Sequence, residues 1–312
     1  MDLAGAVGSG ARRLGIPDDA TMVLAVSGGP DSMALLHGAA RLVETDARSW
    51  RLTVAHLDHA LRPDSADDAR FVAEAAEALA LRFEGLRTDV VALARDEGRS
   101  IEEAAREARY RFLEAVAPEG ALIATAHTAD DAAETVLLNL LRGSGLAGAR
   151  GIPARRGRIV RPLLDARRAT LRELLEAAVI GYRIDPSNDD PAFLRNRVRN
   201  EVLPLLEEIR PGAAERIGQF SRLAADDEAL LEELARGELA RRTSEDGIDW
   251  HDPPLPSLGR RVLRLAVGAP APSAERIEAL LEAAEGSRGG VTIELGGGRV
   301  ASVNQRRVRI LT

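Results

Sequence analysis

The six residues Ser-Gly-Gly-Pro-Asp-Ser at positions 27–32 restrict what this chain can fold into more than any other part of it. The apolar run 23–26 predicts a strand that leads straight into them, and the Ala- and Leu-rich residues that follow predict a helix. Two consecutive glycines let the backbone adopt conformations closed to other residues and bring N–H groups close to an anion. The positive end of the helix dipole points at the same place. The loop is therefore predicted to bind phosphate.

Two residue types are absent from the 312 residues, and both absences narrow the chemistry. Without lysine there is no Walker-type loop, which needs G-x-x-x-x-G-K, and no Schiff base carried by the protein. All 42 basic residues are arginine. Without cysteine there is no disulfide, thiolate metal site, iron–sulfur cluster or persulfide intermediate. Sulfur-transferring enzymes are accordingly disfavoured.

Size and composition are those of an ordinary globular protein, with 45% hydrophobic and 29% charged residues. The length leaves room for one large domain and one or two small ones. No apolar run approaches the roughly 20 residues of a membrane span, and the N-terminus lacks the basic start and apolar core of a signal peptide. A cytoplasmic location without membrane contact is expected.

Charge is distributed unevenly along the chain. The net charge of −7 by itself argues against a nucleic-acid partner. Residues 142–172, however, contain nine arginines and a single acid, Asp165, and three more arginines follow at Arg195, Arg197 and Arg199. Such a basic zone can bind a phosphate backbone whatever the total charge. A solvated loop in an arginine-rich protein is the alternative that charge alone leaves open.

Short apolar runs alternate with helical patterns in the first half of the chain. The expected strands are 22–26, 52–57, 83–88 and 122–126, and the expected helices are 32–43, 65–79, 101–116 and 130–141. This order predicts an α/β fold built on a doubly wound, Rossmann-like parallel sheet. From about residue 201 the pattern is mostly helical and ends in a hairpin, 291–295 and 299–303, with a last strand near 307–311. We expect two domains, 1–204 and 205–312, the second smaller and mainly helical.

Polar clusters follow three of the expected strands. The 27–32 loop follows the first strand, 56–59 (His-Leu-Asp-His) ends the second, and 126–131 (Ala-His-Thr-Ala-Asp-Asp) follows the fourth. Because ligands of such sheets bind beyond the carboxyl ends of the strands, the three clusters are expected to form one site.

Three acids, Asp130, Asp131 and Glu134, lie near the start of an expected helix. Capping and the helix dipole account for one acid there, with a gain of about 0.3–1 kcal/mol. They do not account for three. Asp131 and Glu134 are three residues apart and share a helix face, so that two carboxylates lie close together at the edge of the site. Such a pair can hold an ammonium group or Mg²⁺.

The motif SGGPDS resembles the pyrophosphate loop of the N-type ATP pyrophosphatases, or PP-loop enzymes. Further blocks are similar to the tRNA(Ile)-lysidine synthase family, in family order across residues 20–210. They are HLDHALRPDSADDARFV, EEAAREARYRF, AHTADDAAETVLLNLLRGSGLAGARGI, RPLLDARR and IDPSNDDPAFLRNRVRNEVLPLL. The ending resembles the small substrate-binding domain of that family. No extension follows Thr312, so a short form without the further C-terminal domain of some members is expected.

The resemblance implies an activity. Enzymes of this family use ATP to adenylate C2 of the wobble cytidine of a CAU-anticodon tRNA(Ile), release pyrophosphate, and let L-lysine displace AMP to give lysidine. It implies a catalytic domain, 1–204, and a substrate- and tRNA-binding domain, 205–312, with ATP and Mg²⁺ required and a homodimer expected. The alternative is another PP-loop enzyme that modifies tRNA or a small amide substrate. A degenerate, non-catalytic nucleotide- or RNA-binding protein is disfavoured because the motifs are intact.

The resemblance also implies roles for individual residues. ATP-binding roles fall on Ser27, Gly28, Gly29, Asp31, Ser32 and His127, and Asp31 is in addition the expected Mg²⁺ ligand. Catalytic roles fall on Asp31, Arg109 and Arg195. Lysine binding falls on Asp131 and Glu134, and tRNA binding on Arg155, Arg156, Arg197 and Arg199. Asp58, His59 and Arg62 belong to a block associated with the nucleotide and base end of the site. Ala132 stands where the family commonly has glutamine, which removes one polar side chain beside the lysine site.

Overall fold

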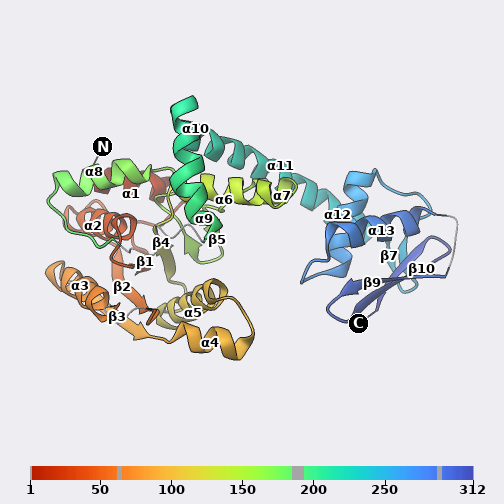
Figure 1. Ribbon diagram of the computed structural model, residues 1–312, viewed down its shortest axis with the longest axis horizontal. Coiled ribbons are helices and arrows are strands. Elements are labelled where there is room, and N and C mark those ends of the chain that lie inside the picture. The colour runs from red at the N-terminus through yellow and green to blue at the C-terminus, as the bar shows by residue number, and fades with distance from the viewer. Residues whose placement is uncertain (1, 62–64, 185–192, 287–289, 312) are drawn as a thin grey trace. The chain divides into compact units, whose positions relative to one another are not determined.

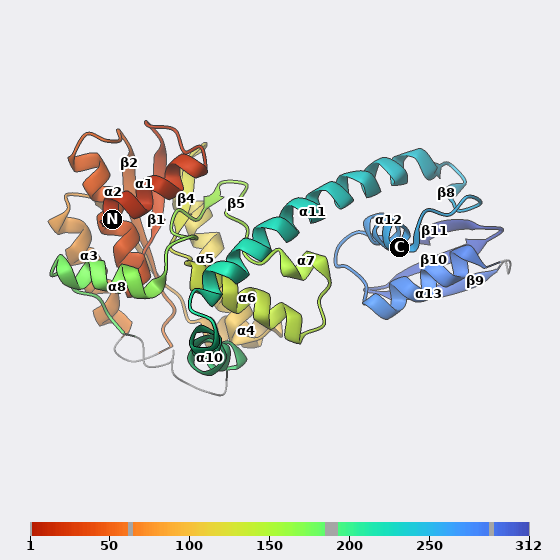
Figure 2. The same ribbon diagram turned by 90° about the horizontal axis from the view of Figure 1, so that it is seen from above.

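A computed structural model describes residues 2–61, 65–184, 193–286 and 290–311. By backbone contacts the chain divides into two compact units, Met1–Arg222 and Leu223–Thr312. The division falls within the long helix α11 (Ala213–Arg242), which is continuous in Figure 2. Among the described residues no helix is both long and apolar enough to cross a bilayer. The expected assignment of roles to 1–204 and 205–312 stays a prediction.

A six-stranded sheet in the order β3-β2-β1-β4-β6-β5 forms the centre of the first unit. Its strands are β1 (Thr21–Ala25), β2 (Arg51–Asp58), β3 (Arg82–Arg87), β4 (Leu122–Thr125), β5 (Arg155–Arg156) and β6 (Ile159–Val160). All neighbouring pairs are parallel except β5 and β6, which form an antiparallel edge. The predicted parallel sheet is thus confirmed, with one short antiparallel strand added.

Helices cover both faces of this sheet (Figure 1). One face packs against α1 (Leu3–Arg13), α2 (Pro30–Glu44), α3 (Ser65–Ala78) and α8 (Arg168–Ala177). The other packs against α5 (Ile101–Val116), beside which α4 (Val90–Glu97) lies. Successive strand residues point to opposite faces, so Leu24 of β1 joins the first core and Val23 the second. This explains why β1 and β4 read as nearly continuous apolar runs.

Two of the helices around the site begin at side-chain caps. Ser100 and Glu103 form a capping box at α5, and Thr128 and Asp131 form another at α6 (Ala129–Leu141). The remaining helices of the unit are α7 (Leu146–Ala149), α9 (Leu194–Arg197), the π-helical turn η2 (Val198–Val202), α10 (Leu203–Ile209) and the start of α11. Glu207 accepts hydrogen bonds from three backbone N–H groups at that start, which fixes α10 against α11.

One close backbone approach gives a prediction for stability. A Cβ built on Gly10 of α1 would lie 1.7 Å from the carbonyl oxygen of Pro162, so alanine cannot fit without movement of the backbone. We expect Gly10→Ala to lower the free energy of unfolding by about 3 kcal/mol or more, measured in urea. Gly218→Ala, the same change in an open part of α11, is the control. It should stabilise by about 0.5–1 kcal/mol, and equal effects of the two would contradict the prediction.

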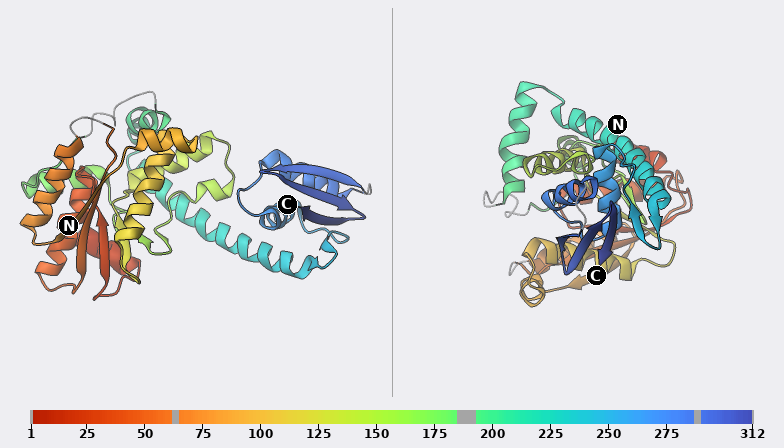
Figure 3. Two further views of the ribbon diagram at one scale, coloured as in Figure 1. Left: turned by 90° about the horizontal axis from the view of Figure 1, so that it is seen from below. Right: turned by 90° about the vertical axis from the view of Figure 1, so that its right-hand side faces the viewer.

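The second unit contains a five-stranded sheet in the order β7-β8-β11-β10-β9. Its strands are β7 (Thr243–Ser244), β8 (Gly247–Asp249), β9 (Val291–Gly296), β10 (Arg299–Asn304) and β11 (Arg307–Leu311). The helices α12 (Pro256–Val267) and α13 (Ala274–Glu285) bury their apolar sides in one core with Trp250 and the inward residues of β9, β10 and β11 (Figure 3). The predicted hairpin and final strand are confirmed, whereas β7 and β8 were too short to predict.

Candidate functional site

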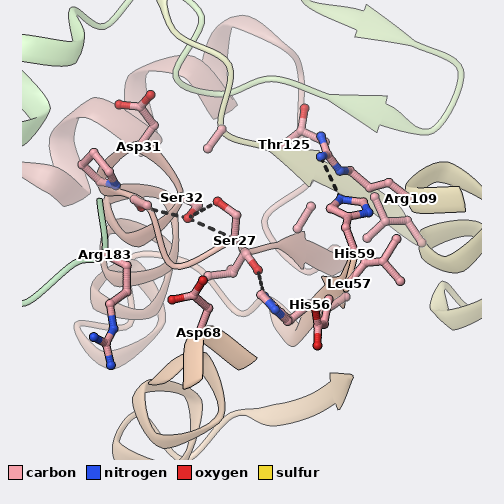
Figure 4. Close-up of a pocket in the computed structure, with 18 of the residues that line it drawn as sticks. Ser27, Asp31, Ser32, His56, Leu57, His59, Asp68, Arg109, Thr125 and Arg183 are labelled. Carbon is pink, nitrogen blue, oxygen red and sulfur yellow. Dashed lines mark hydrogen bonds between the residues drawn. The ribbon is translucent and has the colours of Figure 1, made fainter. Parts of the chain in front are cut away.

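The three predicted polar clusters line one cavity of about 480 Å³ at the carboxyl ends of the parallel strands. Its walls come from the loop after β1, the end of β2, α5, the residues after β4, and α8. Figure 4 shows Ser27, Asp31 and Ser32 on one side of this cavity and His59 and Arg109 on the other. The clusters that follow three separate strands therefore form a single site, as predicted.

The 27–32 loop has the geometry of an anion cradle. Gly28 lies at a φ of +87°, a left-handed conformation that other residues rarely adopt. The Ser32 hydroxyl donates to the Gly29 carbonyl at 2.9 Å and accepts from the Ser27 backbone N–H at 3.2 Å, which closes the loop on itself (Figure 4). The fold thus holds the loop in shape before any ligand binds.

Helix α2 begins at this loop without a side-chain cap. Its N-cap is Gly29 and its first residue is Pro30, and among the described residues it has no side-chain cap hydrogen bond. By contrast, side-chain oxygens cap both α5 and α6. The unsatisfied N–H groups of α2 and its dipole are left for a ligand in the cavity. Two arginines from other elements, Arg172 and Arg183, also line the cavity.

In the part of the chain that the structure describes, only one carboxylate oxygen of Asp31, in the first turn of α2, accepts a hydrogen bond. Its Oδ2 accepts from Nε of Arg168 at 3.2 Å, and its buried Oδ1 has no hydrogen-bond partner among the described residues. Burial raises the pKa of Asp31, Arg168 opposes this, and Asp131 raises it further, so that it reaches about 6. An oxygen of this kind fits a cation that arrives with the ligand.

Asp31 Oδ1 is also the oxygen that would bind the expected Mg²⁺. Among the described residues no group of three or more His, Cys, Asp or Glu side chains could hold a metal by itself. Mg²⁺ in phosphate-transferring sites is typically held by one or two carboxylates together with phosphate oxygens. Asp31 Oδ1 suits that arrangement, in which ATP supplies the other ligands.

Three arginines surround the acid pair of α6. Arg168 donates through Nη2 to Asp131 at 3.0 Å and through Nη1 to Glu134 at 3.1 Å. Arg195 Nε reaches Glu134 at 3.0 Å, and Arg199 Nε reaches the same carboxylate at 2.8 Å. The side chain of Glu134 is fully buried. In this structure guanidinium groups therefore occupy the positions where an amine ligand was expected.

Charge neutralisation explains why these acids can be buried. Asp31, Asp131 and Glu134 carry three negative charges, and Arg168, Arg195 and Arg199 carry three positive ones. Burial raises the pKa of Asp131, but Arg168 and the other nearby cations outweigh it and bring the pKa to about 2. Asp131 therefore stays ionised at neutral pH.

Arg168 is the residue that connects the two halves of the site. Its guanidinium contacts Asp31 of the 27–32 loop, the predicted phosphate loop, as well as Asp131 and Glu134. The Arg168 side chain is 13% exposed. Arg195 and Arg199 come from α9 and η2 and are more exposed, at 37% and 23%. We infer that Arg168 is the fixed member of the trio.

His59 and Arg109 lie on the far side of the cavity from the 27–32 loop, and His127 lines the cavity just after the end of β4. His127 Nδ1 is 2.9 Å from the Thr125 hydroxyl, and Arg109 donates to His59 Nε2 at 3.1 Å. Burial lowers the pKa of each histidine to about 4, so both rings are neutral near pH 7. No described acid pairs with Arg109, which leaves its charge available to the cavity.

The predicted RNA-binding arginines are not all together. Arg199 lines the cavity, whereas Arg197 is exposed and pairs with Glu201 of the following turn. Arg156 lies over the ring of Tyr110 at 5.5 Å, next to the cavity wall. Arg155 lines a separate cavity near the starts of β1 and β4, at the opposite edge of the sheet. Arg62 and the predicted polar loop 185–190 lie outside the described residues.

Sequence reasoning missed three residues of the site: Arg168, Arg172 and Arg183. Arg168 and Arg172 were counted in the basic zone, and Arg168 falls in the block RPLLDARR, but nothing in the sequence assigned them to the acids or the loop. Their spacing of four residues on α8, which places them on one helix face, was the available signal. The Arg183 backbone N–H donates to the Gly28 carbonyl at 2.9 Å, a contact between distant parts of the sequence.

Comparison with known proteins adds to this geometry. Residues 11–206 match the profile of the PP-loop domain family. The chain is 48% identical over 220 residues to the tRNA(Ile)-lysidine synthase of Thermus thermophilus and 45% identical over 225 residues to that of Geobacter sulfurreducens. These alignments cover 70% of this chain and 42% and 47% of those proteins. The chain thus spans about half the length of the curated relatives it matches.

The fold is also similar to that of a protein with low sequence identity. A U34-tRNA thiolase from Methanococcus maripaludis superposes with a TM-score of 0.59 at 16% identity, covering 72% of this chain and 78% of that one. At this identity the likeness shows a common fold and no more. It agrees with the doubly wound sheet described above.

Proposed function

This chain belongs to the PP-loop family, and on that premise we propose that it ligates L-lysine to C2 of the wobble cytidine of a CAU-anticodon tRNA(Ile). Its similarity to tRNA(Ile)-lysidine synthases supports the proposal. So does the chemistry that the cavity residues can perform. The proposal includes ATP as the adenylating substrate, Mg²⁺ as its counter-ion, and lysidine as the product.

One observation carries the proposal: the phosphate loop and the acid pair lie within a single hydrogen-bond network. The same Arg168 guanidinium contacts Asp31 at 3.2 Å and Asp131 at 3.0 Å. An enzyme that activates an oxygen with ATP and then delivers an amine to the activated carbon needs both sites side by side.

The reaction has two steps. In the first, the C2 oxygen of the cytidine attacks the α-phosphorus of ATP, and the bond to pyrophosphate breaks. In the second, the uncharged ε-amine of lysine attacks C2, the amine loses a proton, and the C2–O bond breaks to release AMP. The first step turns a poor leaving group into a good one.

The phosphate loop and the arginines serve the first step. The Ser27–Ser32 loop and the start of α2 would hold the β- and γ-phosphates, with Arg172 and Arg183 beside them. Asp31 would bind Mg²⁺, which neutralises charge on the departing pyrophosphate. Arg109 faces the cavity from the opposite side, where it would stabilise charge at the α-phosphate, and His127 would contact the phosphates as a neutral donor.

The acid pair serves the second step. Asp131 and Glu134 would hold lysine through its amino groups, which requires guanidinium groups to leave. The ε-ammonium would have to lose a proton before its nitrogen attacks C2. Arg195 and Arg199 are the more exposed members of the trio and can turn toward phosphates of ATP or RNA. Arg195 would then contribute to catalysis, and Arg199 and Arg197 to RNA binding. The expected homodimer and cytoplasmic location stay predictions.

A labelling experiment tests the proposal. Purified protein is incubated with ATP, Mg²⁺, labelled lysine and a CAU-anticodon tRNA(Ile) transcript, and the RNA is digested to nucleosides. We expect label in lysidine and none with tRNA(Met) as substrate. Pyrophosphate release with RNA but no lysine incorporation would overturn the choice of nucleophile and favour the alternative, another PP-loop enzyme of tRNA or a small amide.

The raised pKa of Asp31 predicts how activity depends on pH. The carboxylate has to be ionised to bind Mg²⁺, and its pKa of about 6 means that it protonates as the pH falls through 6. We expect kcat/KM for ATP to fall about tenfold per pH unit below 6, because this constant reports groups of the free enzyme. Asp131, with a pKa near 2, and His127, near 4, do not titrate between pH 5 and 7.

The Asp31→Asn variant is the control for this assignment. Its residual kcat/KM should be independent of pH between 5 and 7. A wild-type profile that stays flat down to pH 5, or a variant that keeps the same limb, would assign the dependence to another group.

A further inference from the structure

Four arginines gather around one tyrosine at the α5 side of the cavity. The Tyr110 cluster consists of Arg106, Arg109, Tyr110, Arg156 and Arg161. The guanidinium of Arg106 lies 5.1 Å from the centroid of the Tyr110 ring, and that of Arg156 lies 5.5 Å from it. Arg106 and Tyr110 are four residues apart on α5 and share a face, whereas Arg156 comes from β5. Cation–π attraction thus brings charges from two distant segments together.

The charges of the Tyr110 cluster have no counter-ions within the part of the chain that the structure describes. Across the described ranges, none of its four arginines forms an ion pair, whereas Arg168, Arg195 and Arg199 all bind carboxylates. Arg109 donates to a neutral histidine, His59.

Arg161 is the most unusual member because it is 2% exposed. It donates through Nη1 to the Pro153 carbonyl at 2.6 Å, and its buried Nε has no described partner. A buried cation without a counter-ion is costly, so the cluster is a strong attractor of anions.

The cluster adjoins the cavity but opens beyond it. Arg109 and Tyr110 line the cavity wall, whereas Arg106 and Arg156 are exposed and do not line it. Arg161 directly follows β6, which runs parallel to β4, so it lies at the same edge of the sheet as His127. A linear polymer that places one of its units in the cavity would therefore run past this cluster.

We propose that the Tyr110 cluster binds a backbone phosphate of RNA beside the nucleotide whose base enters the cavity. This proposal rests on the proposed function for the identity of the RNA. A nucleotide in the cavity is joined to its neighbours by phosphates that have to stay outside, next to the cavity wall. Exposed arginines held on a tyrosine ring suit such a phosphate, because guanidinium binds phosphate oxygens through two parallel hydrogen bonds. The β- and γ-phosphates of ATP have a separate cradle at the start of α2, and Arg109 is the one member of the cluster that the proposed function assigns to ATP, at its α-phosphate.

The test is the salt dependence of RNA binding. A labelled anticodon stem-loop with the CAU sequence is titrated with protein, without ATP or lysine, from about 50 to 200 mM salt. Each phosphate contact to single-stranded RNA contributes about 0.7 to the slope of log K against log salt concentration. We expect the double variant Arg106→Gln/Arg156→Gln to lower the magnitude of this slope by about 0.7–1.4 and to weaken binding about 5- to 20-fold at 100 mM salt.

A matched double variant controls for net charge. Arg51→Gln/Arg82→Gln removes the same charge at the starts of β2 and β3, at the opposite edge of the sheet, and should leave the slope unchanged. Tyr110→Leu removes the ring without changing charge and should weaken binding severalfold, whereas Tyr110→Phe should not. Thermal unfolding of each variant shows whether it is folded.

Two outcomes would overturn the proposal. One is a cluster variant that binds RNA with the wild-type affinity and slope. The other is a cluster variant that loses affinity for ATP instead, which would assign the arginines to the nucleotide. Neither depends on lysine transfer: a wild type that binds RNA but makes no lysidine would contradict the proposed function and leave this site standing.

Discussion

Asp31→Ala should lower pyrophosphate release from ATP by about 100- to 1000-fold, the range seen when a preorganised group that stabilises transition-state charge is removed. The reason is the place of Asp31 in the site. It has the one carboxylate in the first turn of α2, and its Oδ1 is buried without a described partner. On the proposed function, loss of that oxygen would remove the carboxylate that holds Mg²⁺ beside the departing pyrophosphate. RNA-dependent pyrophosphate release, measured at saturating ATP, tests this.

Stability separates this effect from misfolding. A carboxylate whose pKa is raised above its unfolded value favours the protonated form in the folded state, so its ionisation above pH 6 costs stability. Asp31→Ala should therefore be folded at pH 7 and no less stable than the wild type. If Asp31→Ala is unfolded, the same loss of pyrophosphate release should be measured with Asp31→Asn. Near-normal turnover in a folded variant would remove Asp31 from the site.

The phosphate loop could be predicted from sequence because its chemistry is local. The glycines, the serines and the start of α2 are consecutive, so one six-residue motif specified both the positive φ of Gly28 and the uncapped helix. The strands β1 and β4 could be predicted for a related reason, since burial on both faces makes each of them a continuous apolar run, whereas the edge strand β3 is largely exposed. Strand ends then placed the three polar clusters in one cavity.

The arginine partners could not be predicted, because they depend on contacts between distant segments. Arg168 is 37 residues from Asp131 and 137 from Asp31, and no periodicity connects such positions. The same holds for Arg156 and Tyr110, which meet only because β5 folds back on β6 as an antiparallel edge of two residues. A strand that short leaves no pattern in the sequence. Arg155 shows how charge alone misleads a prediction. It is adjacent to Arg156 in the same basic run, but it lines a separate cavity near the starts of β1 and β4.

The occupied acid pair changes how lysine binding has to be understood. If the two carboxylates had no partners, binding of a lysine ammonium would gain the whole energy of a new ion pair. Here the pair already binds three guanidinium groups, so on the proposed function lysine would exchange one set of charged hydrogen bonds for another. The net gain is then small unless the released arginines find phosphates. Lysine affinity should accordingly be higher when ATP or RNA is present, which isothermal titration with and without each of them can measure.

Glu134→Gln should raise KM for lysine about 10- to 100-fold, which corresponds to the roughly 1.5–3 kcal/mol of a hydrogen bond to a charged group. Glu134 is fully buried and accepts from Arg168, Arg195 and Arg199, so the pocket is built around its charge. The amide keeps the shape and removes the charge. KM for ATP should change much less, because the phosphate loop and Asp31 are intact.

Glu201→Gln is the matched control, since Glu201 is exposed and pairs with Arg197 alone among the described residues. It should leave both KM values unchanged. Removal of one charge from a buried cluster also leaves three guanidinium groups with fewer counter-ions, and for this reason Glu134→Gln should unfold at a lower temperature than the wild type. That loss does not depend on lysine, whereas the change in KM does. Equal effects on the KM of lysine and of ATP would assign Glu134 to a metal or to the phosphates, and the amine would then have to bind elsewhere in the cavity.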